Sequence, residues 1–268
     1  MDILVCVKQV PDDSVEIKVK KESNQPNFEN VAMVVNAFDT YALEMATRFK
    51  EENSGEITVL TLGEESAKDA IKSCFSVGAN KGYLIRDEKF NNSDILGVSH
   101  ILSKTILKLE QELGKKFDVI FCGKESTDIT SGQVGAQLSQ NLDRALSSNI
   151  IEINLKNDSI ETKQETEDGY NVVETTVPCV VTVTKPNYEP RYPTIKSKMA
   201  ARKMEIGIID SSSIEGIDLG KVGVINSHVK MLRFYEPCKK QSGIKIQEET
   251  CADSAVKAVE IMAESKVF

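Results

Sequence analysis

The segment FDVIFCGKESTDITSGQVGAQ, residues 117–137, indicates the fold class most clearly, because its pattern passes from a strand through a polar loop into a helix. Residues 117–122 are mostly apolar and rich in β-formers, which predicts a buried strand. Gly123 begins the loop, and a helix is expected from about Ser131 to Leu142. A strand followed at once by a helix is the unit from which parallel sheets are built.

The same alternation of strands and helices continues from this segment back to the start of the chain. The runs DILVCV (residues 2–7), EITVLTL (56–62) and KGYLIR (81–86) predict further strands. Helices are expected between them, with Asp39 and Ser93 as N-caps. The sequence therefore predicts an α/β fold, with a mostly parallel sheet that helices cover on both faces.

The pattern changes after residue 150. Three prolines within 186–193 predict an exposed loop, and residues after about 210 indicate an extended arm that ends in a helix. Short strands with turns between them predict an antiparallel meander attached to the sheet, at 150–155, 159–163, 170–177 and 179–184.

We therefore predict two parts in the chain. Residues 1–210 form the α/β domain, which includes the antiparallel extension 150–184. Residues 211–268 form a C-terminal arm and helix. An arm with so few core residues is typical of a segment that packs on another chain, and we expect that role here.

Composition and charge argue against several classes of protein. The chain has 268 residues, and 33 basic and 41 acidic side chains give a net charge of −8, so nucleic acid is a poor candidate partner. No apolar run approaches the ~18 residues of a membrane span, and residues 1–7 lack a basic leader. The six cysteines are irregularly spaced, which disfavours a metal site and fits a reducing compartment. We expect a cytoplasmic protein without membrane insertion.

A search for catalytic side chains finds no matching set. The two histidines are His100 and His228, and His100 falls in the middle of an expected helix, where we expect a structural role. The sequence contains no HExxH, GxSxG or Walker A motif. The chain therefore lacks the pattern of a hydrolase, and no residue is assigned a catalytic role.

The segment Gly123–Gln137 is the strongest candidate for ligand binding. Gly123 and Gly132 allow close approach of the backbone, and the helix start offers free N–H groups to a phosphate. Asp128 is placed to accept from a ribose hydroxyl. Two interpretations stay open, a phosphate site at the carboxyl edge of the sheet or a capped loop made of ordinary turn residues. Asn36 and Asp39 likewise either contact an adenine or a ribose, or act as helix caps alone.

Seven short motifs occur in one order along the chain. They are VCVKQVPD (5–12), NAFD (36–39), GKESTD (123–128), QVG (133–135), EDG (167–169), VPCVVT (177–182) and EPRY (189–192). Together they resemble the β subunit of an electron transfer flavoprotein, over nearly the whole chain to about Ile206. Each motif has little specificity alone, and the ordered set carries the resemblance.

The resemblance implies a fold of the adenine nucleotide-binding type and a nucleotide held in its crevice. It also implies an α subunit as partner, on which the redox FAD is bound. The residues implied in nucleotide binding are Cys6, Asn36, Ala37, Phe38, Asp39, Leu62, Gly123, Lys124, Glu125, Ser126, Thr127, Asp128, Ile129, Thr130, Ser131, Gly132, Gln133 and Val134.

Members of this family are of two kinds, which differ in that nucleotide. Simple members hold AMP as a structural ligand and serve acyl-CoA dehydrogenases, whereas electron-bifurcating members hold a second FAD and take hydride from NADH. KQVPD (8–12) and QVG (133–135) resemble the bifurcating form, and Asp39 stands where AMP-binding members often have Cys. The tetrad 36–39 departs from the NPDD usual in bifurcating members, and ESTD (125–128) departs from the QAID that the family favours. We expect the bifurcating form, with the AMP form as the alternative.

The resemblance also implies the chain's partners. The loop 186–202 matches the segment that docks a flavin-linked dehydrogenase, of the acyl-CoA or lactate type, and ferredoxin is a candidate acceptor. Redox chemistry would then belong to the flavin complex, with no catalytic side chain in this chain. An ATP-pyrophosphatase-like hydrolase is disfavoured because KQVPDD (8–13) replaces the expected SGGxDS loop. An interaction scaffold with an empty crevice is the remaining alternative.

Overall fold

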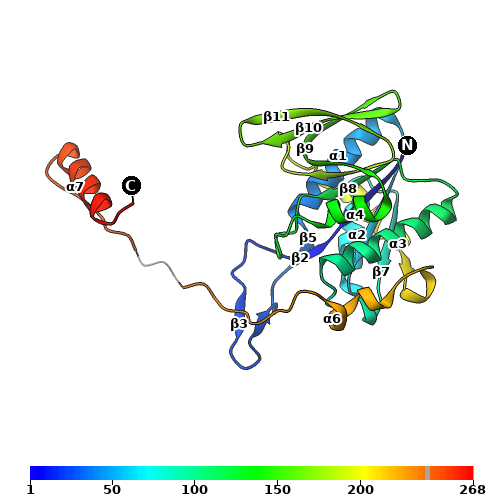
Figure 1. Cartoon of the computed structure of the whole chain (residues 1–268), viewed down its shortest axis with the longest axis horizontal. Helices are drawn as coiled ribbons and strands as arrows, with labels where there is room; N and C mark the ends of the chain where they lie inside the picture. The colour runs from blue at the N-terminus through cyan, green and yellow to red at the C-terminus, as the bar shows by residue number, and fades with distance from the viewer. Residues whose placement is uncertain (239–241, 268) are drawn as a thin grey trace. The chain divides into compact units, whose positions relative to one another are not determined.

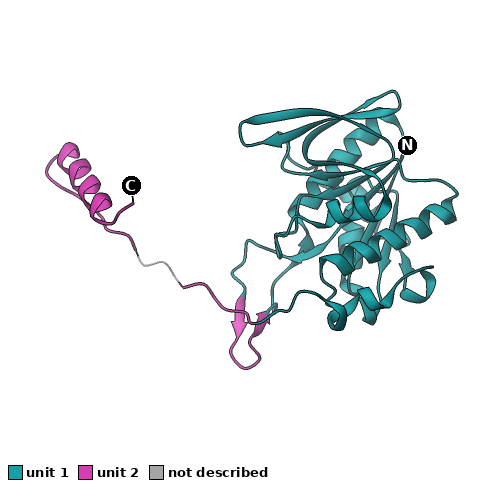
Figure 2. Cartoon of the chain, viewed as in Figure 1, with its two compact units in different colours: residues 1–17, 27–232 teal, residues 18–26, 233–268 magenta. Residues whose placement is uncertain are grey.

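The computed structural model of the chain describes residues 1–238 and 242–267, so residues 239–241 and 268 of the predicted arm lie outside the described part. The chain divides into two units, coloured separately in Figure 2. The larger consists of residues 1–17 and 27–232, and the smaller of residues 18–26 and 233–268. Residues 211–232, which the sequence analysis assigns to the C-terminal arm, thus belong to the larger unit in this structure.

The larger unit is built on a nine-stranded sheet (Figure 1). Seven of its strands lie mainly parallel, as the apolar runs predict. In spatial order the strands are β11 (Gly169–Thr176), β10 (Ser159–Thr166), β9 (Ala145–Lys156), β12 (Cys179–Val183), β8 (Val119–Gly123), β1 (Asp2–Val7), β6 (Glu56–Leu62), β7 (Lys81–Ile85) and β13 (Gly207–Ile209).

Two hydrophobic cores lie on the two faces of this sheet. Alternate residues of β1 point to opposite faces, so Ile3 and Val5 belong to one core and Leu4 to the other. The first core contains residues of α1 (Ala37–Asn53), α2 (Lys68–Phe75) and α5 (Ile195–Ala201), and the second contains residues of α3 (Ile95–Leu113) and α4 (Val134–Leu142). The predicted α/β fold with helices on both faces is confirmed.

Shorter elements complete the larger unit. Strands β2 (Gln9–Pro11) and β5 (Met33–Val35) form an antiparallel ribbon. The remaining helical turns are η1 (Glu65–Ala67), η2 (Glu88–Phe90), η3 (Ser211–Ser213), η4 (Leu219–Lys221) and α6 (Gly223–Asn226).

The structure differs from the sequence prediction in the strand at 179–184. Strands β9, β10 and β11 form the antiparallel extension, as expected. Strand β12 instead pairs parallel to both β8 and β9, so it is an interior strand of the main sheet. All five of its residues are buried, because neighbours cover both its edges and both its faces. The position of β12 matters because the 186–202 segment leaves the sheet at its carboxyl end.

Helix starts also differ by a few residues from the expected ones. The long helix α3 has its N-cap at Asp94, whose side chain accepts from the N–H of Gly97, and Ser93 lies one residue outside. Helix α1 has Asn36 at the N-cap position and Asp39 inside its first turn. Helix α4 begins at Val134, so the loop after Gly123 is longer than predicted.

The smaller unit contains the strand β3 (Lys18–Lys20), most of β4 (Gln25–Asn27), and the helix α7 (Cys251–Glu264). The predicted C-terminal helix is confirmed, and Thr250 caps it by accepting from the N–H of Asp253 at 3.1 Å. Every described residue of α7 is at least partly exposed, including Val256, Val259 and Met262. Among the described helices, none combines the length and the apolar character that a bilayer span requires.

Candidate functional site

The loops that follow four neighbouring parallel strands meet at one edge of the sheet. Strands β6, β1, β8 and β12 are adjacent in that order, and their carboxyl ends lead to Gly63, Lys8, the residues after Gly123 and Thr184. Ligands of open parallel sheets bind at this edge. We call residues 123–133 the Gly123 loop, and it lies where the sequence predicted it.

One buried carboxylate joins two of these loops. Asp39 lies in the first turn of α1 and is 7 % exposed. Its Oδ2 accepts from the backbone N–H of Lys8 at 2.7 Å, and its Oδ1 accepts from the N–H of Gly123 at 3.1 Å. The prediction of Asp39 as an N-cap was wrong, because the side chain reaches across to the loops after β1 and β8.

The side chain of Asn36 holds the Gly123 loop at two further points. Its Nδ2 donates to the carbonyl of Glu125 at 2.8 Å, and its Oδ1 accepts from the N–H of Thr127 at 3.0 Å. Asn36 is 1 % exposed and makes no side-chain cap bond to its own helix. The interpretation of Asn36 as a helix cap alone was therefore wrong, because its side chain contacts the loop backbone, whereas its contact with a nucleotide stays a prediction.

The close approach of α1 to the end of β8 requires glycine at position 123. A Cβ built there would lie 2.3 Å from Asp39 Oδ1 and 2.8 Å from the Cβ of Phe38. Real Cβ atoms do not approach other atoms so closely, so either the helix or the strand would have to move. The geometry of the Gly123 loop thus depends on the absence of a side chain at its first residue.

Several polar groups of the Gly123 loop remain without an intramolecular partner. Within the described residues, the hydroxyls of Ser126, Thr127 and Ser131 make no hydrogen bond. The N-cap residue of α4, Gln133, forms no side-chain cap bond, so the first-turn N–H groups of this helix also lack partners. Thr130 and Gly132 have φ values of 52° and 63°, which fold the loop back before the helix. These donors form a set suited to an anion.

Lys8 is a site residue that the sequence prediction did not include. Its Nζ donates to both carboxylate oxygens of Asp128, at 2.8 and 2.6 Å. Both side chains are partly exposed, so the ion pair adds little to folding stability. The carboxylate of Asp128, expected to contact a ribose, is bonded to Lys8 in this structure. The signal for Lys8 was its place directly after β1 in the VCVKQVPD motif.

A second pair of side chains joins the loops after β1 and β6. Gln9 Nε2 donates to the carbonyl of Ser66 at 3.0 Å, and the Ser66 hydroxyl donates to Gln9 Oε1 at 2.9 Å. Leu62 is the last residue of β6 and is half-buried. Neither Gln9 nor Ser66 was predicted, because contacts between loops distant in sequence leave no local pattern.

The other predicted residues lie around the same edge with different exposures. Cys6 and Cys122 are buried in one hydrophobic core, on the adjacent strands β1 and β8. Phe38 and Val134 are half-buried, whereas Ala37 and Ile129 are exposed. The structure therefore brings the predicted residues to one region. Which of them contact a ligand stays a prediction.

Burial and hydrogen bonding together set the ionisation of three buried groups, Asp39, Cys74 and Cys122. Burial raises the pKa of Asp39 to about 7, against the opposing effect of hydrogen bonds from Lys8, Asn36 and Gly123. Burial also raises the pKa of Cys74 to about 12, and a hydrogen bond with Cys6 together with burial raises that of Cys122. Of these three groups, only Asp39 changes charge near neutral pH.

The 186–202 segment follows β12 and is attached to α1 by one arginine. Arg191 contacts Glu44 and Glu51 of that helix, at 2.8 and 2.6 Å. Burial acts to raise the pKa of Glu44, but hydrogen bonds from Arg191 and Arg48 outweigh it and hold that pKa below its usual value. Arg48 also lies 3.9 Å from the ring centroid of Tyr188. The beginning of the segment is thereby fixed on the helix surface.

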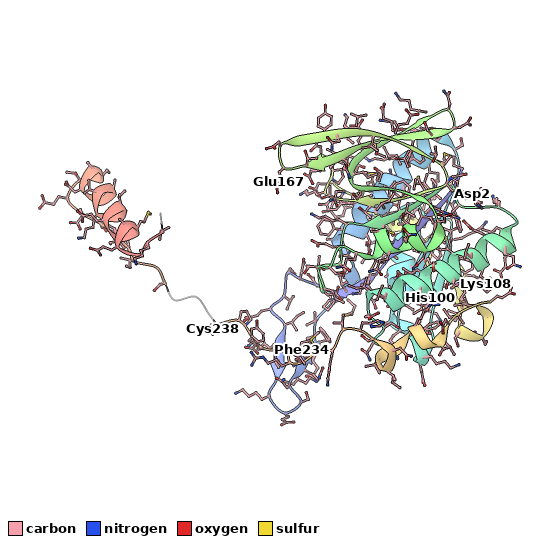
Figure 3. All side chains as sticks on the ribbon, viewed as in Figure 1. Asp2, His100, Lys108, Glu167, Phe234 and Cys238 are labelled. Atoms are coloured by element: carbon pink, nitrogen blue, oxygen red, sulfur yellow. The ribbon has the colours of Figure 1, made fainter. Side chains whose placement is uncertain are left out.

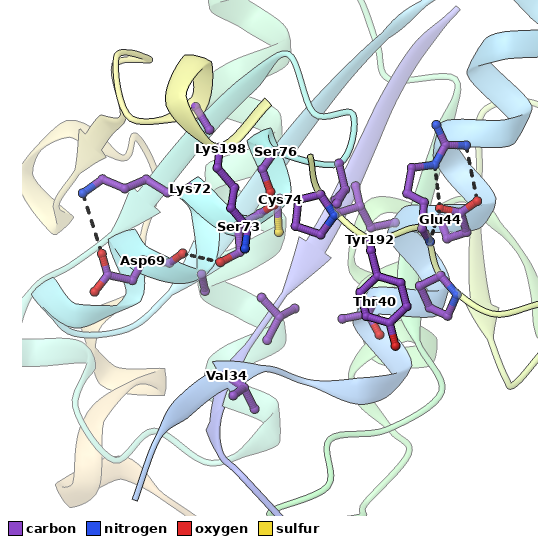
Figure 4. A pocket seen from close by; sticks show the side chains of 18 of the residues that line it. Val34, Thr40, Glu44, Asp69, Lys72, Ser73, Cys74, Ser76, Tyr192 and Lys198 are labelled. Atoms are coloured by element: carbon purple, nitrogen blue, oxygen red, sulfur yellow. Dashed lines mark hydrogen bonds and ion pairs between the residues drawn. The ribbon is translucent and has the colours of Figure 1, made fainter. Parts of the chain in front are cut away.

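A groove of about 630 Å³ lies beside this segment and apart from the Gly123 loop. Figure 4 shows Val34, Cys74, Tyr192 and Lys198 around it. Three apolar side chains of the segment are largely exposed, Tyr192 at 92 %, Ile195 at 82 % and Met199 at 60 %. Such a surface is typical of a contact with another protein.

The predicted structural role of His100 agrees with its contacts. His100 lies on α3, where Figure 3 labels it, and its Nε2 accepts from the N–H of Asp218 at 3.1 Å. Burial and nearby lysines lower its pKa. Among the described residues, no group of three or more His, Cys, Asp or Glu side chains is arranged to hold a metal ion.

Comparisons with known proteins match nearly the whole chain. A family model described as "Electron transfer flavoprotein domain" matches residues 28–213. The "Electron transfer flavoprotein subunit beta" of Megasphaera elsdenii is 33% identical over 258 residues, which are 96% of this chain and 95% of that protein. The "Caffeyl-CoA reductase-Etf complex subunit CarD" of Acetobacterium woodii is 31% identical over 269 residues, with both chains fully covered. The "Acryloyl-CoA reductase electron transfer subunit gamma" of Anaerotignum propionicum is 30% identical and covers 92% of each chain.

Proposed function

The chain belongs to the electron transfer flavoprotein family as a β subunit, and from this premise we propose that it carries electrons by flavin-based bifurcation. In this proposal it works in the cytoplasm, paired with an α subunit, and binds FAD in its own crevice. Electrons enter from NADH and leave toward a flavin-linked dehydrogenase and a low-potential acceptor such as ferredoxin. The alternative is a non-bifurcating β subunit that holds AMP and serves acyl-CoA dehydrogenases.

The observation that carries nucleotide binding is the set of unpaired donors in the Gly123 loop. The hydroxyls of Ser126, Thr127 and Ser131 and the uncapped start of α4 fit the phosphate or pyrophosphate of an adenine nucleotide. Lys8 adds a positive charge at the same edge and would exchange Asp128 for the phosphate. An FAD held by these groups would supply the hydride-accepting and electron-transferring chemistry.

Cofactor counting separates the two versions of this proposal. The heterodimer with its α subunit would be purified and denatured, and the released FAD and AMP quantified. Two FAD per heterodimer, both bleached by NADH, support the bifurcating version. One FAD with one AMP overturns that version and favours the alternative. A single FAD and no second nucleotide contradicts both.

Residues 211–268 are proposed to pack on the α subunit. The support is their exposed apolar side chains, such as Ile225 at 92 % and Leu232 at 85 %. In the smaller unit the apolar residues of α7 are likewise exposed. A chain that exposes so many apolar side chains gains stability when a partner covers them. Deleting residues 251–268 should then weaken heterodimer formation in sedimentation, and an unchanged dissociation constant would contradict this role.

The 186–202 segment is proposed to dock the dehydrogenase. Its exposed Tyr192, Ile195 and Met199 would bury against an apolar site on that partner. Lys198 and Arg202 have no acidic partner among the described residues and would face acidic groups. The names of two relatives, subunits of caffeyl-CoA and acryloyl-CoA reductase complexes, support a partner of the acyl-CoA type. A lactate-type dehydrogenase is the second candidate.

A further inference from the structure

Two loops of the proposed nucleotide site depend on one buried carboxylate. Asp39 uses both its oxygens on backbone N–H groups, one from Lys8 and one from Gly123. Lys8 carries the cation of the site, and Gly123 begins the loop that carries the unpaired donors. Asp39 therefore sets the distance between Lys8 and the donors of the Gly123 loop. Its own side chain is too buried to contact the nucleotide easily.

We propose that Asp39 is a positioning residue of the nucleotide site, which holds the Lys8 segment and the Gly123 loop at the separation that the nucleotide requires. In its charged form the carboxylate accepts from both N–H groups. In its neutral form one oxygen carries a proton and becomes a weaker acceptor, so one of the two loops is held less tightly. This inference rests on the proposed binding of an adenine nucleotide, and it adds that nucleotide affinity depends on the ionisation of Asp39.

The burial of Asp39 argues that the carboxylate is retained for the site and not for folding. A buried carboxylate is unfavourable unless hydrogen bonds compensate it, and burial here raises its pKa to about 7 despite two backbone donors. An asparagine has nearly the same size and no charge, but it offers only one acceptor oxygen to two N–H donors. The carboxylate instead gives each loop an acceptor oxygen of its own.

The groups around Asp39 leave it as the titrating residue near neutral pH. Lys8, after β1, is the charged side chain that lowers its pKa. Cys74 on α2 and Cys122 on β8 are influenced by the Asp39 charge, but their raised pKa values keep both thiols neutral. The cause is burial for Cys74, and a hydrogen bond with Cys6 together with burial for Cys122. Asn36, at the start of α1, carries no charge. A change of affinity with pH would thus report on Asp39 once the ionisation of the ligand is removed.

The experiment compares AMP binding by the full chain, stripped of nucleotide, with that of the Asp39→Asn variant. Calorimetric titrations would be run at about pH 6 and about pH 8.5, on either side of the Asp39 pKa. The wild-type chain should bind AMP about tenfold more tightly than the variant at the higher pH, and about equally at the lower pH. Because the AMP phosphate titrates in the same way for both proteins, the ratio of their affinities isolates Asp39. Asp158→Asn, in the turn between β9 and β10, is the matched control and should behave as wild type.

Three results separate the inference from the proposed function. Equal affinity of wild type and Asp39→Asn at both pH values overturns the positioning role but leaves nucleotide binding intact. If neither the wild-type chain nor the Asp39→Asn variant binds AMP or FAD, the proposed function itself is overturned. If the variant does not fold, amide hydrogen exchange of Gly123 and Lys8 in the wild-type chain decides the case. After correction for intrinsic rates, their protection should fall below about pH 7, and constant protection would overturn the inference.

Discussion

The segments that follow β8 and β12 leave the same edge of the sheet and are built in opposite ways. The Gly123 loop directs its backbone inward to Asn36 and Asp39, and its hydroxyls remain unpaired. The 186–202 segment directs apolar side chains outward, with Tyr192 and Ile195 almost fully exposed. The first is suited to surround a small polar ligand, and the second to meet another protein.

Helix α1 supports both segments. Its start holds the Gly123 loop through two buried side chains, and two acidic residues farther along, Glu44 and Glu51, hold Arg191 of the 186–202 segment. A nucleotide and a docked dehydrogenase would therefore contact parts of the protein fixed to one rigid helix. We therefore expect that variants in the Gly123 loop weaken nucleotide binding, and that variants in the 186–202 segment weaken partner docking without affecting the nucleotide.

The largest effect is expected for Gly123→Ala. The added Cβ would meet Asp39 Oδ1 at 2.3 Å, which displaces the carboxylate and moves the loop. AMP affinity should fall about 100-fold, measured by calorimetry, and folding stability by about 1–3 kcal/mol. Gly243→Ala, where a Cβ meets no atom within 4 Å, is the matched control. Unchanged affinity in Gly123→Ala would show that the nucleotide binds elsewhere.

The next effect is expected for Ile195→Asp, which places a charge in the exposed apolar patch. Electron transfer between the heterodimer and its dehydrogenase should slow about 10-fold or more at limiting partner concentration, because the buried contact is lost. AMP affinity and thermal stability should not change, since Ile195 is 82 % exposed. The matched control is Ile208→Asp, on β13, which is 51 % exposed. Equal rates for the two variants would argue against docking through this segment.

A smaller effect is expected for Arg191→Met, which removes the attachment of the 186–202 segment to α1. The apolar patch stays intact but becomes less well positioned, so the transfer rate should fall about 3- to 5-fold. The Arg191→Lys variant should recover little of the lost transfer rate, because one ammonium cannot bridge Glu44 and Glu51 as the guanidinium does. Stopped-flow rates for both variants test this, and a full rescue by lysine would contradict the bridging role.

The smallest expected effect is a dependence of thermal stability on pH. Asp39 has a raised pKa, so between about pH 4 and pH 7 the folded chain binds more protons than the unfolded chain. Its contribution to stability must therefore decrease as pH rises through this range, and level off above about 7. His100, whose pKa is lowered, acts in the opposite direction, so wild type is compared with Asp39→Asn. The melting temperature of wild type relative to the variant should fall across this pH range, and a rise would contradict the assignment.

The sequence predicted the sheet well because its strands are continuous apolar runs. Residues 2–7, 56–62 and 117–122 lie in the centre, where burial on both faces makes the pattern unambiguous. The assignment of residues 179–184 to the antiparallel meander was wrong, and the sequence contained a sign of their true place in the main sheet. CVVTV is as apolar as the central strands, whereas β11 has the exposed alternation of an edge strand. The short turns before residues 179–184 favoured a meander in the sequence prediction, although the apolar composition of this strand favoured the main sheet.

The sequence predicted where the candidate site lies in the fold, but it did not predict the contacts that its side chains make. The Gly123 loop lies at the carboxyl edge because a strand precedes it and a helix follows it. The roles of Asn36 and Asp39 were not predictable from local pattern, since their partners in the Gly123 loop lie 84 to 91 positions away in sequence. Gln9 and Ser66 were missed for the same reason, whereas the position of Lys8 directly after β1 was a signal that the prediction did not use.

Nucleotide binding at the Gly123 loop is tested most directly by counting the adenine nucleotides that the denatured heterodimer releases, for wild type and for Gly123→Ala. We expect two adenine nucleotides from the wild-type heterodimer, as FAD or AMP, and one from the variant. That result would place one nucleotide at the Gly123 loop of this chain. Two nucleotides from both proteins, or a single nucleotide from wild type, would contradict it.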